Sequence, residues 1–151
     1  MYFSSDENTL IRLEILDYEF NTFSYDEDAD WLNVKIEVND KKEKLHWIAC
    51  NACLRTFELK EIKSWFLSIL NKEKFILPKL SFMEPELSFI YKDGIIGLEF
   101  NYTFHPEWGV DFDINSDGYV LYFKLNTNSL LSLISELDKL ICAYPCRSEQ
   151  A

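Results

Sequence analysis

The sequence predicts an α+β fold in which a bent antiparallel sheet of about six strands is packed by two helices, in the order βββ-α-βββ-α. Most apolar segments alternate with polar residues, as strands with one buried face do. Two other segments carry apolar residues at helical spacing. An Asp-Gly pair between two alternating runs is typical of a tight antiparallel hairpin.

The first half of the chain begins with alternating segments separated by a polar run. Residues 11–20 alternate, but the phase slips, which predicts a strand with a bulge near Ile15-Leu16. Residues 21–30 are polar and acidic, so we expect a loop there. Residues 32–38 then alternate cleanly, and after a charged turn the alternation resumes at Leu45. These segments make the first three strands.

Two segments predict helices. Residues 59–70 have one apolar face, and Thr56 is placed to cap the start of that helix. Near the C-terminus, Thr127-Asn128 can cap a final helix whose wide apolar stripe extends to Ile141.

Three more strands lie between these helices. Alternation predicts them over residues 87–92, 96–104 and 119–125, with residues 105–118 as a loop. The pair Asp93-Gly94 supplies a two-residue turn between the first two, so their pairing must be antiparallel.

The composition places the chain among compact soluble domains. The chain has 151 residues, of which 48% are hydrophobic, so residues 1–151 have the size of a single domain with one core. The start lacks the basic and apolar regions of a signal peptide, and no segment approaches the roughly 20 apolar residues of a membrane span. We therefore expect a cytoplasmic protein with reduced cysteines.

The formal net charge is −11, and the acids are concentrated near the N-terminus. Residues 1–40 contain eleven acids and two bases, a net charge of −9. This excess repels nucleic acid and anionic membranes and favours rapid association with a basic partner. Solubility alone is the alternative explanation of such acidity.

A metal site would use the four cysteines. Cys50-Asn51-Ala52-Cys53 has the spacing of zinc ligands, and Cys142 with Cys146 could complete a tetrahedral set, with His46 in reserve. Because Cys142 follows an apolar helical stripe, buried thiols acting as small hydrophobic side chains are the simpler interpretation. We expect no metal and no cofactor; the alternative is a metal-stabilised or small-molecule-binding intracellular domain that uses these cysteines.

Residues with catalytic chemistry are few and scattered. His46 and His105 are the two histidines, and no nucleophile elbow, zinc-protease motif or phosphate-binding glycine loop accompanies them. Glu84, Glu86 and Glu99 fall on or beside adjoining predicted strands and could supply paired carboxylates, with solvated strand charge as the alternative. We expect a binding protein rather than an enzyme.

The segment Asp113-x-Asn115-x-Asp117-Gly118 matches the first half of a calcium-binding loop. The twelfth position of such a loop needs a bidentate Glu, and here it is Lys124. We therefore interpret the segment as a turn in which Asp and Asn side chains hydrogen bond to their own backbone.

The most partner-like feature is the acidic cluster in the first polar run. Aromatic side chains can anchor an interface by becoming buried in it, and clustered charge beside them attracts an oppositely charged partner before contact. The alternative is a solvated loop with the tryptophan turned into the core. The expected partner-binding residues are Tyr25, Asp26, Glu27, Asp28, Asp30 and Trp31.

Several segments together resemble the wall-associated protein immunity (WapI) family. The most specific of them is Ser81-Phe82-Met83-Glu84-Pro85-x-Leu87-Ser88-Phe89. Two departures from the family pattern are Glu86, where we expect Asn, and the cysteines at 50, 142 and 146. The other matching stretches are Asp30-Trp31-Leu32 with the strand to Val38, Cys53-Leu54-x-Thr56-x-Glu58-Leu59, Glu99 with Pro106-x-Trp108, and Tyr144-Pro145-x-Arg147.

This resemblance implies a small cytoplasmic inhibitor that protects a bacterium from its own or a sibling's polymorphic toxin. Such a protein binds a toxin domain, commonly a nuclease, and blocks its active site or substrate path. Nuclease surfaces are basic because they hold phosphate, so the acidity of this chain agrees with such a partner.

Overall fold

A computed structural model describes residues 1–5, 7–21, 25–109, 111–115 and 117–148. It confirms the α+β class and the antiparallel pairing, with eight strands in two four-stranded sheets and the order ββββ-α-ββββ-α. The elements are β1 Tyr2–Ser4, β2 Leu10–Tyr18, the 3₁₀ helix η1 Glu27–Asp30, β3 Trp31–Asp40, β4 Leu45–Arg55, α1 Thr56–Leu70, β5 Lys79–Ser81, β6 Leu87–Lys92, β7 Ile95–Phe100, the 3₁₀ helix η2 Tyr102–Phe104, β8 Tyr119–Phe123 and α2 Thr127–Ala143.

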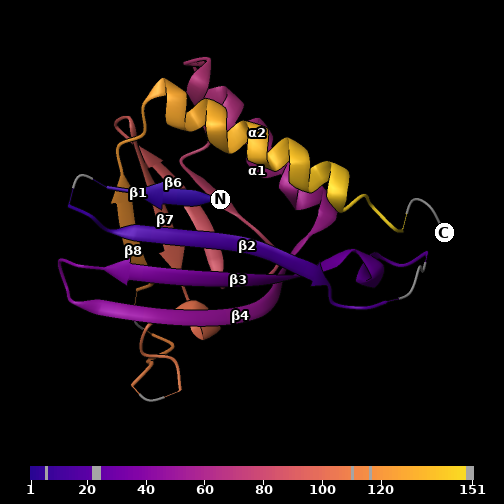
Figure 1. Cartoon of the computed structure of the whole chain (residues 1–151), viewed down its shortest axis with the longest axis horizontal. Coiled ribbons are helices and arrows are strands. Elements are labelled where there is room, and N and C mark those ends of the chain that lie inside the picture. The colour runs from indigo at the N-terminus through magenta and orange to yellow at the C-terminus, as the bar shows by residue number, and fades with distance from the viewer. Residues whose placement is uncertain (6, 22–24, 110, 116, 149–151) are drawn as a thin grey trace.

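The strand count exceeds the expected six because β1 and β5 are only three residues long. Such short strands show no period that alternation could reveal. The expected single bent sheet is two sheets: β4 leads directly into α1, and no strand among the described residues pairs with strands of both sheets. In Figure 1 the strands of the second sheet run across those of the first, and the two helices lie side by side above them.

The first sheet, β1-β2-β3-β4, contains the predicted bulge. Ile15 pairs with Val34 and Asp17 with Asn33, so Leu16 is the extra residue, and its side chain is 47% exposed. A second bulge lies on β4, where Leu54 pairs with Leu32 and Ala52 with Asn33. The extra residue there is Cys53.

The second sheet, β5-β6-β7-β8, contains the predicted hairpin. Asp93 and Gly94 have φ values of 52° and 81°, the left-handed pair that a tight two-residue turn requires. The expected strand to Phe104 ends at Phe100 instead, because Tyr102 adopts a φ of 48° and begins η2. Phe104 is nevertheless buried.

Both predicted helices are present, but each begins with a different cap from the expected one. At α1 the cap position is Arg55, whose backbone N–H donates to Glu58 Oε2 at 2.7 Å, while the Thr56 side chain turns elsewhere. At α2 the side chain of Asn126 accepts from the Ser129 N–H at 2.8 Å.

One hydrophobic cluster includes residues of both sheets and both helices. Phe3 of β1 is fully buried, and its ring centroid lies 6.5 Å from that of Phe66, 6.4 Å from Phe89 and 6.0 Å from Phe123. These partners come from α1, β6 and β8. A three-residue strand therefore supplies a contact that joins the two sheets to a helix.

Candidate functional site

The acidic loop, which we define as Tyr25–Trp31, connects β2 to β3 and contains η1. Asp26 precedes η1 and accepts from the Asp28 N–H at 2.7 Å, which satisfies a donor at the start of this short helix. The Tyr25 side chain is 87% exposed, and Asp26, Glu27 and Asp28 are exposed as well. The structure thus presents four of the six expected partner-binding residues to solvent.

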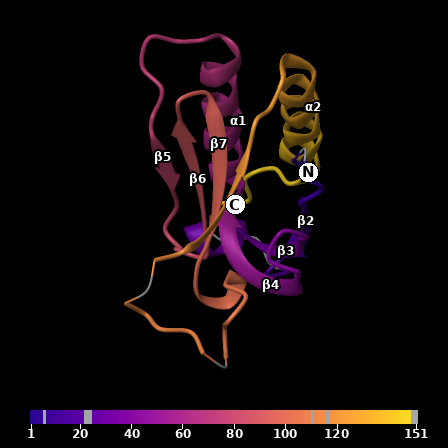
Figure 2. The ribbon, with the colours of Figure 1, turned by 90° about the vertical axis from the view of Figure 1, so that its left-hand side faces the viewer.

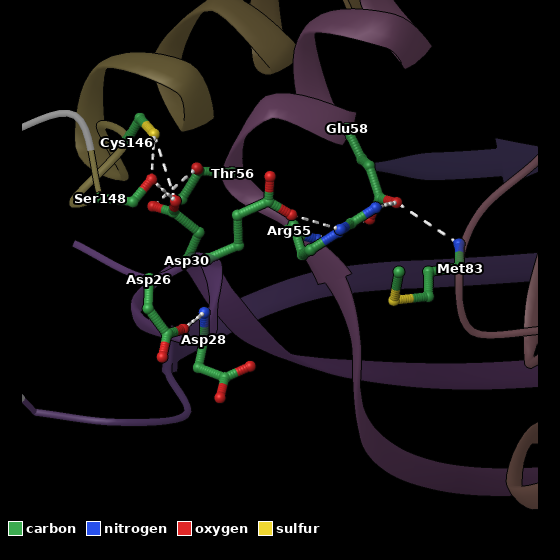
Figure 3. Close-up of polar contacts among 10 residues, drawn as sticks. Asp26, Asp28, Asp30, Arg55, Thr56, Glu58, Met83, Cys146 and Ser148 are labelled. Carbon is green, nitrogen blue, oxygen red and sulfur yellow. Dashed lines mark hydrogen bonds and ion pairs between the residues drawn. The ribbon is translucent and has the colours of Figure 1, made fainter. Parts of the chain in front are cut away.

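Asp30 differs from the other acids of the loop because it is fully buried. Its carboxylate accepts from Thr56 Oγ1 at 3.1 Å, from the Arg147 N–H at 2.6 Å, from Cys146 Sγ at 3.2 Å and from Ser148 Oγ. Burial alone would raise the pKa of Asp30, but these hydrogen bonds outweigh it and hold the pKa below its usual value. Figure 3 shows the carboxylate beside Thr56, Cys146 and Ser148.

Trp31 is half-buried and contacts a cation rather than the deep core. The Arg55 guanidinium lies 5.4 Å from the centre of the Trp31 ring and 4.4 Å from that of Phe57. The same guanidinium donates to Glu27 Oε2 and to Glu58 Oε1, each at 2.9 Å. Arg55 therefore links η1, through Glu27, to the first turn of α1, through Glu58.

Burial disfavours the charged guanidinium of Arg55, but the hydrogen bond and charge of Glu58 and the charge of Glu27 outweigh this and raise its pKa. Glu58 also accepts from the Met83 N–H at 3.5 Å (Figure 3). The chain of contacts thus extends from the acidic loop to the segment Ser81–Phe89, which carried the family resemblance.

The four cysteines do not come together. Cys50 is exposed on β4, whereas Cys53, the extra residue of the β4 bulge, is fully buried. Burial first, and then the charges of Glu86, Glu58 and Glu84, raise the pKa of the Cys53 thiol well above its usual value. Cys142 is exposed on α2, whereas Cys146 contacts Asp30.

Among the described residues, no group of three or more His, Cys, Asp and Glu side chains could hold a metal ion. The alternative of a zinc site built from the four cysteines therefore has no geometric support. The calcium-like segment forms the expected turn: Asp113 Oδ1 accepts from the Asn115 N–H at 2.9 Å. Residue 116 of that segment lies outside the described residues.

The paired carboxylates considered for catalysis have separate environments. Burial would raise the pKa of Glu99, but hydrogen bonds from Lys79, Asn101 and Ser88 lower it below its usual value. Glu86 is buried, its Oε2 has no hydrogen-bond partner, and burial followed by the charge of Glu84 raises its pKa. Neither side chain lines the cleft of about 750 Å³ beside β8.

The two histidines lie in different surroundings. His46 is exposed and its Nε2 lies 3.2 Å from Glu37 Oε1. His105 is buried between Phe112 and Tyr119, and its Nδ1 accepts from the Glu107 N–H at 3.1 Å. Each imidazole thus has local contacts of its own, and the structure does not combine them into one site.

Sequence reasoning missed the contribution of the C-terminal segment to the acidic loop. Cys146, Arg147 and Ser148 lie 116 to 118 residues from Asp30, and no local pattern links them. The one available signal is general: an aspartate that becomes buried needs several donors. Such a signal does not say which of four neighbouring acids is buried.

No helix among the described residues is long and apolar enough to cross a membrane. No curated protein and no solved structure matches the chain. The Immunity protein WapI-like family matches it over residues 2–145, which is nearly the whole sequence. The segments that suggested this resemblance include both Asp30 at the centre of the buried hydrogen bonds and the stretch next to Glu58. The chain therefore belongs to the Immunity protein WapI-like family.

Proposed function

We propose that this protein binds and neutralises a basic toxin domain, a nuclease, without catalysis of its own, and that the acidic loop is its principal contact. Membership of an immunity protein family implies a cognate toxin as partner. The observation that carries the choice of surface is the exposed cluster of Tyr25, Asp26, Glu27 and Asp28 on a loop held by Arg55 and Asp30.

The charge distribution supports a basic partner. The chain carries a net charge of −11, and residues 1–40 account for −9 of it. Asp30 and Asp40 of this region are buried, and its other described acids are exposed or half-buried. Exposed acids speed encounter with a positive surface and compete with the phosphate backbone for it. The exposed Tyr25 ring supplies area that can anchor a complex once the charges have brought the partners together.

The absence of catalysis belongs to the same proposal. The histidines are separately engaged, and in the described part of the chain no residues cluster as metal ligands. Inhibition by binding needs only that the complex cover the toxin's active site or its substrate path. We propose that this occurs in the cytoplasm, where the toxin would otherwise act.

The first experiment identifies the partner by a pull-down. Tagged protein is used to pull down its partner from cells at low salt, and the bound material is eluted at high salt and identified. We expect a basic toxin domain whose nuclease activity falls as the immunity protein is added. Elution of a toxin that cleaves neither RNA nor DNA would contradict the nuclease assignment alone.

The surface is tested by association kinetics at several salt concentrations. A triple variant with Asp26→Asn, Glu27→Gln and Asp28→Asn should associate about tenfold more slowly at low salt, with a flatter salt dependence. The matched control changes Asp111, Asp113 and Asp117 to Asn, which alters the net charge by the same amount in the segment between β7 and β8. Figure 2 shows this segment extending from the end of the molecule opposite the helices. Equal slowing in both variants would mean that total charge matters and that the acidic loop is not the contact.

A further inference from the structure

Asp30 is the point at which three segments of the chain meet. Its carboxylate lies on η1, the Thr56 hydroxyl comes from the first residue of α1, and the other donors belong to Cys146, Arg147 and Ser148 near the C-terminus. Figure 3 shows Cys146 and Ser148 on one side of the carboxylate and Asp26 and Asp28 on the other. The exposed acids and the C-terminal segment are therefore connected through one buried side chain.

The C-terminal segment is also fixed on the side away from Asp30. Tyr18 Oη donates to the Pro145 carbonyl at 2.6 Å, and Arg147 Nη1 donates to the Phe20 carbonyl at 2.7 Å. The Arg147 guanidinium lies 3.4 Å from the centre of the Tyr18 ring. Residues 144–148 thus connect the end of β2 to η1, which are the two ends of the connection that contains the acidic loop.

We propose, resting on the function proposed above, that Asp30 is a positioning residue for toxin binding and that residues 144–148 act through it as a strap that sets the geometry of the acidic loop. Asp30 itself is too deeply buried to touch a partner. Its effect on binding comes from keeping Asp26, Glu27 and Asp28 in one arrangement before the toxin arrives. A loop that is already ordered loses less conformational entropy on binding, which tightens the complex.

Loop positioning by Asp30 and electrostatic steering by the exposed acids affect different rate constants of toxin binding. Steering depends on the charges of the exposed acids and sets the association rate, whereas loop order mainly sets the lifetime of the complex. Releasing the strap leaves those three exposed charges in place. It should therefore shorten the complex lifetime and leave the salt dependence of association close to that of the wild type.

The first arm of the test uses the free protein and needs no toxin. Hydrogen exchange of the amides of residues 25–31 is compared among the wild type, Asp30→Asn, and the double variant Cys146→Ala with Ser148→Ala, which loses two side-chain donors to Asp30 and keeps the contacts of Arg147 with Phe20 and Tyr18. We expect faster exchange in both variants and less than an additive increase when they are combined, because both weaken the hydrogen bonds between Asp30 and residues 146 and 148. Asp138→Asn, the same chemical change on α2, should exchange like the wild type in this loop.

Milder variants keep the test decisive if Asp30→Asn unfolds the protein. Cys146→Ala and Ser148→Ala each remove one side-chain donor, and Cys146→Ser restores a donor at that position. Exchange in the loop should rise in the two alanine variants and return toward the wild-type rate in Cys146→Ser. Unchanged exchange in every variant that folds would overturn the strap.

The second arm measures toxin binding. We expect Asp30→Asn to dissociate about tenfold faster, because the loop must then be ordered in the complex, with an unchanged salt slope of association. If the triple variant of the exposed acids binds as well as the wild type, the proposed contact surface fails, and the exchange data still decide on the strap. If that triple variant slows association while Asp30→Asn changes neither exchange nor dissociation, the strap is wrong and the contact surface stands.

Discussion

Replacing Glu86 by Gln should stabilise the protein at neutral pH. The Glu86 side chain is 7% exposed, its Oε2 has no hydrogen-bond partner, and the hydrogen bond from Thr103 Oγ1 to its Oε1 is long, at 3.5 Å. A hydrogen bond from the backbone of Glu86 itself lowers the pKa of this carboxylate, but burial outweighs it. A buried acceptor without a partner costs about 1–3 kcal/mol, and more when it is charged. An amide keeps the shape of the side chain and removes the charge. The family resemblance also leads us to expect an amide residue at this position.

The magnitude follows from that cost. Because Gln must still bury one polar group, we expect Glu86→Gln to raise the free energy of unfolding by about 1 kcal/mol at pH 7. For a domain of this size the corresponding rise in Tm is about 2–4 °C. Urea unfolding followed by tryptophan fluorescence measures the first quantity, and thermal unfolding measures the second. Glu73→Gln is the control, the same chemical change on an exposed side chain that is not among the charges acting on Glu86.

The pH dependence gives the sharper result. Burial and Glu84 raise the pKa of Glu86 in the folded protein, whereas in the unfolded chain it titrates near its usual value of 4.5. Below that pH both states are protonated and the wild type has no penalty. As the pH rises through the folded-state pKa, the wild type loses stability, so the advantage of Glu86→Gln should grow from about zero at pH 4 to its full value at neutral pH. If Glu86→Gln were less stable than the wild type, or if the difference in stability were the same at every pH, the Glu86 carboxylate would have hydrogen-bond partners and its burial would not destabilise the protein.

Two further predictions concern the second sheet and the cysteines. Gly118→Ala should lower the free energy of unfolding by about 1–3 kcal/mol. A Cβ at this position would lie 2.6 Å from both Asn101 Oδ1 and Glu99 Cγ, so these side chains would have to move. An unchanged urea midpoint would contradict this prediction. Treatment with EDTA should leave Tm unchanged, and elemental analysis should find zinc far below one equivalent, since Cys50 is exposed on β4 while Cys53 is buried. Near-stoichiometric zinc that stabilises the fold would instead support the cysteine site.

Patterns with a period were enough to predict most of the fold. Alternation located β2 together with its bulge at Leu16, and Asp93-Gly94 located the turn between β6 and β7. The three-residue strands β1 and β5 were missed because they are too short to show a period, whereas the wrong strand end and the wrong helix cap arise because tertiary contacts override local preference. Tyr102 continues the alternation of β7 but takes a left-handed φ, and Thr56 is a good cap residue whose hydroxyl is instead used by Asp30.

The candidate site was less accessible to prediction than the fold. Asp28 and Asp30 have the same side chain in the same acidic run, and composition gives both the same role. Only the folded chain separates them, because it exposes Asp28 and surrounds Asp30 with donors more than a hundred residues away. Charge patterning therefore identified an acidic region, while the distinction between contact and support required the three-dimensional arrangement.

That distinction affects how the acidic loop must be tested. The donors to Asp30 are two hydroxyls, a thiol and a backbone N–H, so hydrogen bonding fixes this carboxylate without using a basic side chain. Neutralising Asp30 together with Asp26, Glu27 and Asp28 would combine lost steering with a disordered loop, and a slower or weaker complex would then have two causes. Changing the exposed acids and Asp30 in separate variants assigns the association rate to the first group and the complex lifetime to the second. If both variants alter the same rate constant, positioning and contact are not separable, and Asp30 acts as part of one electrostatic surface.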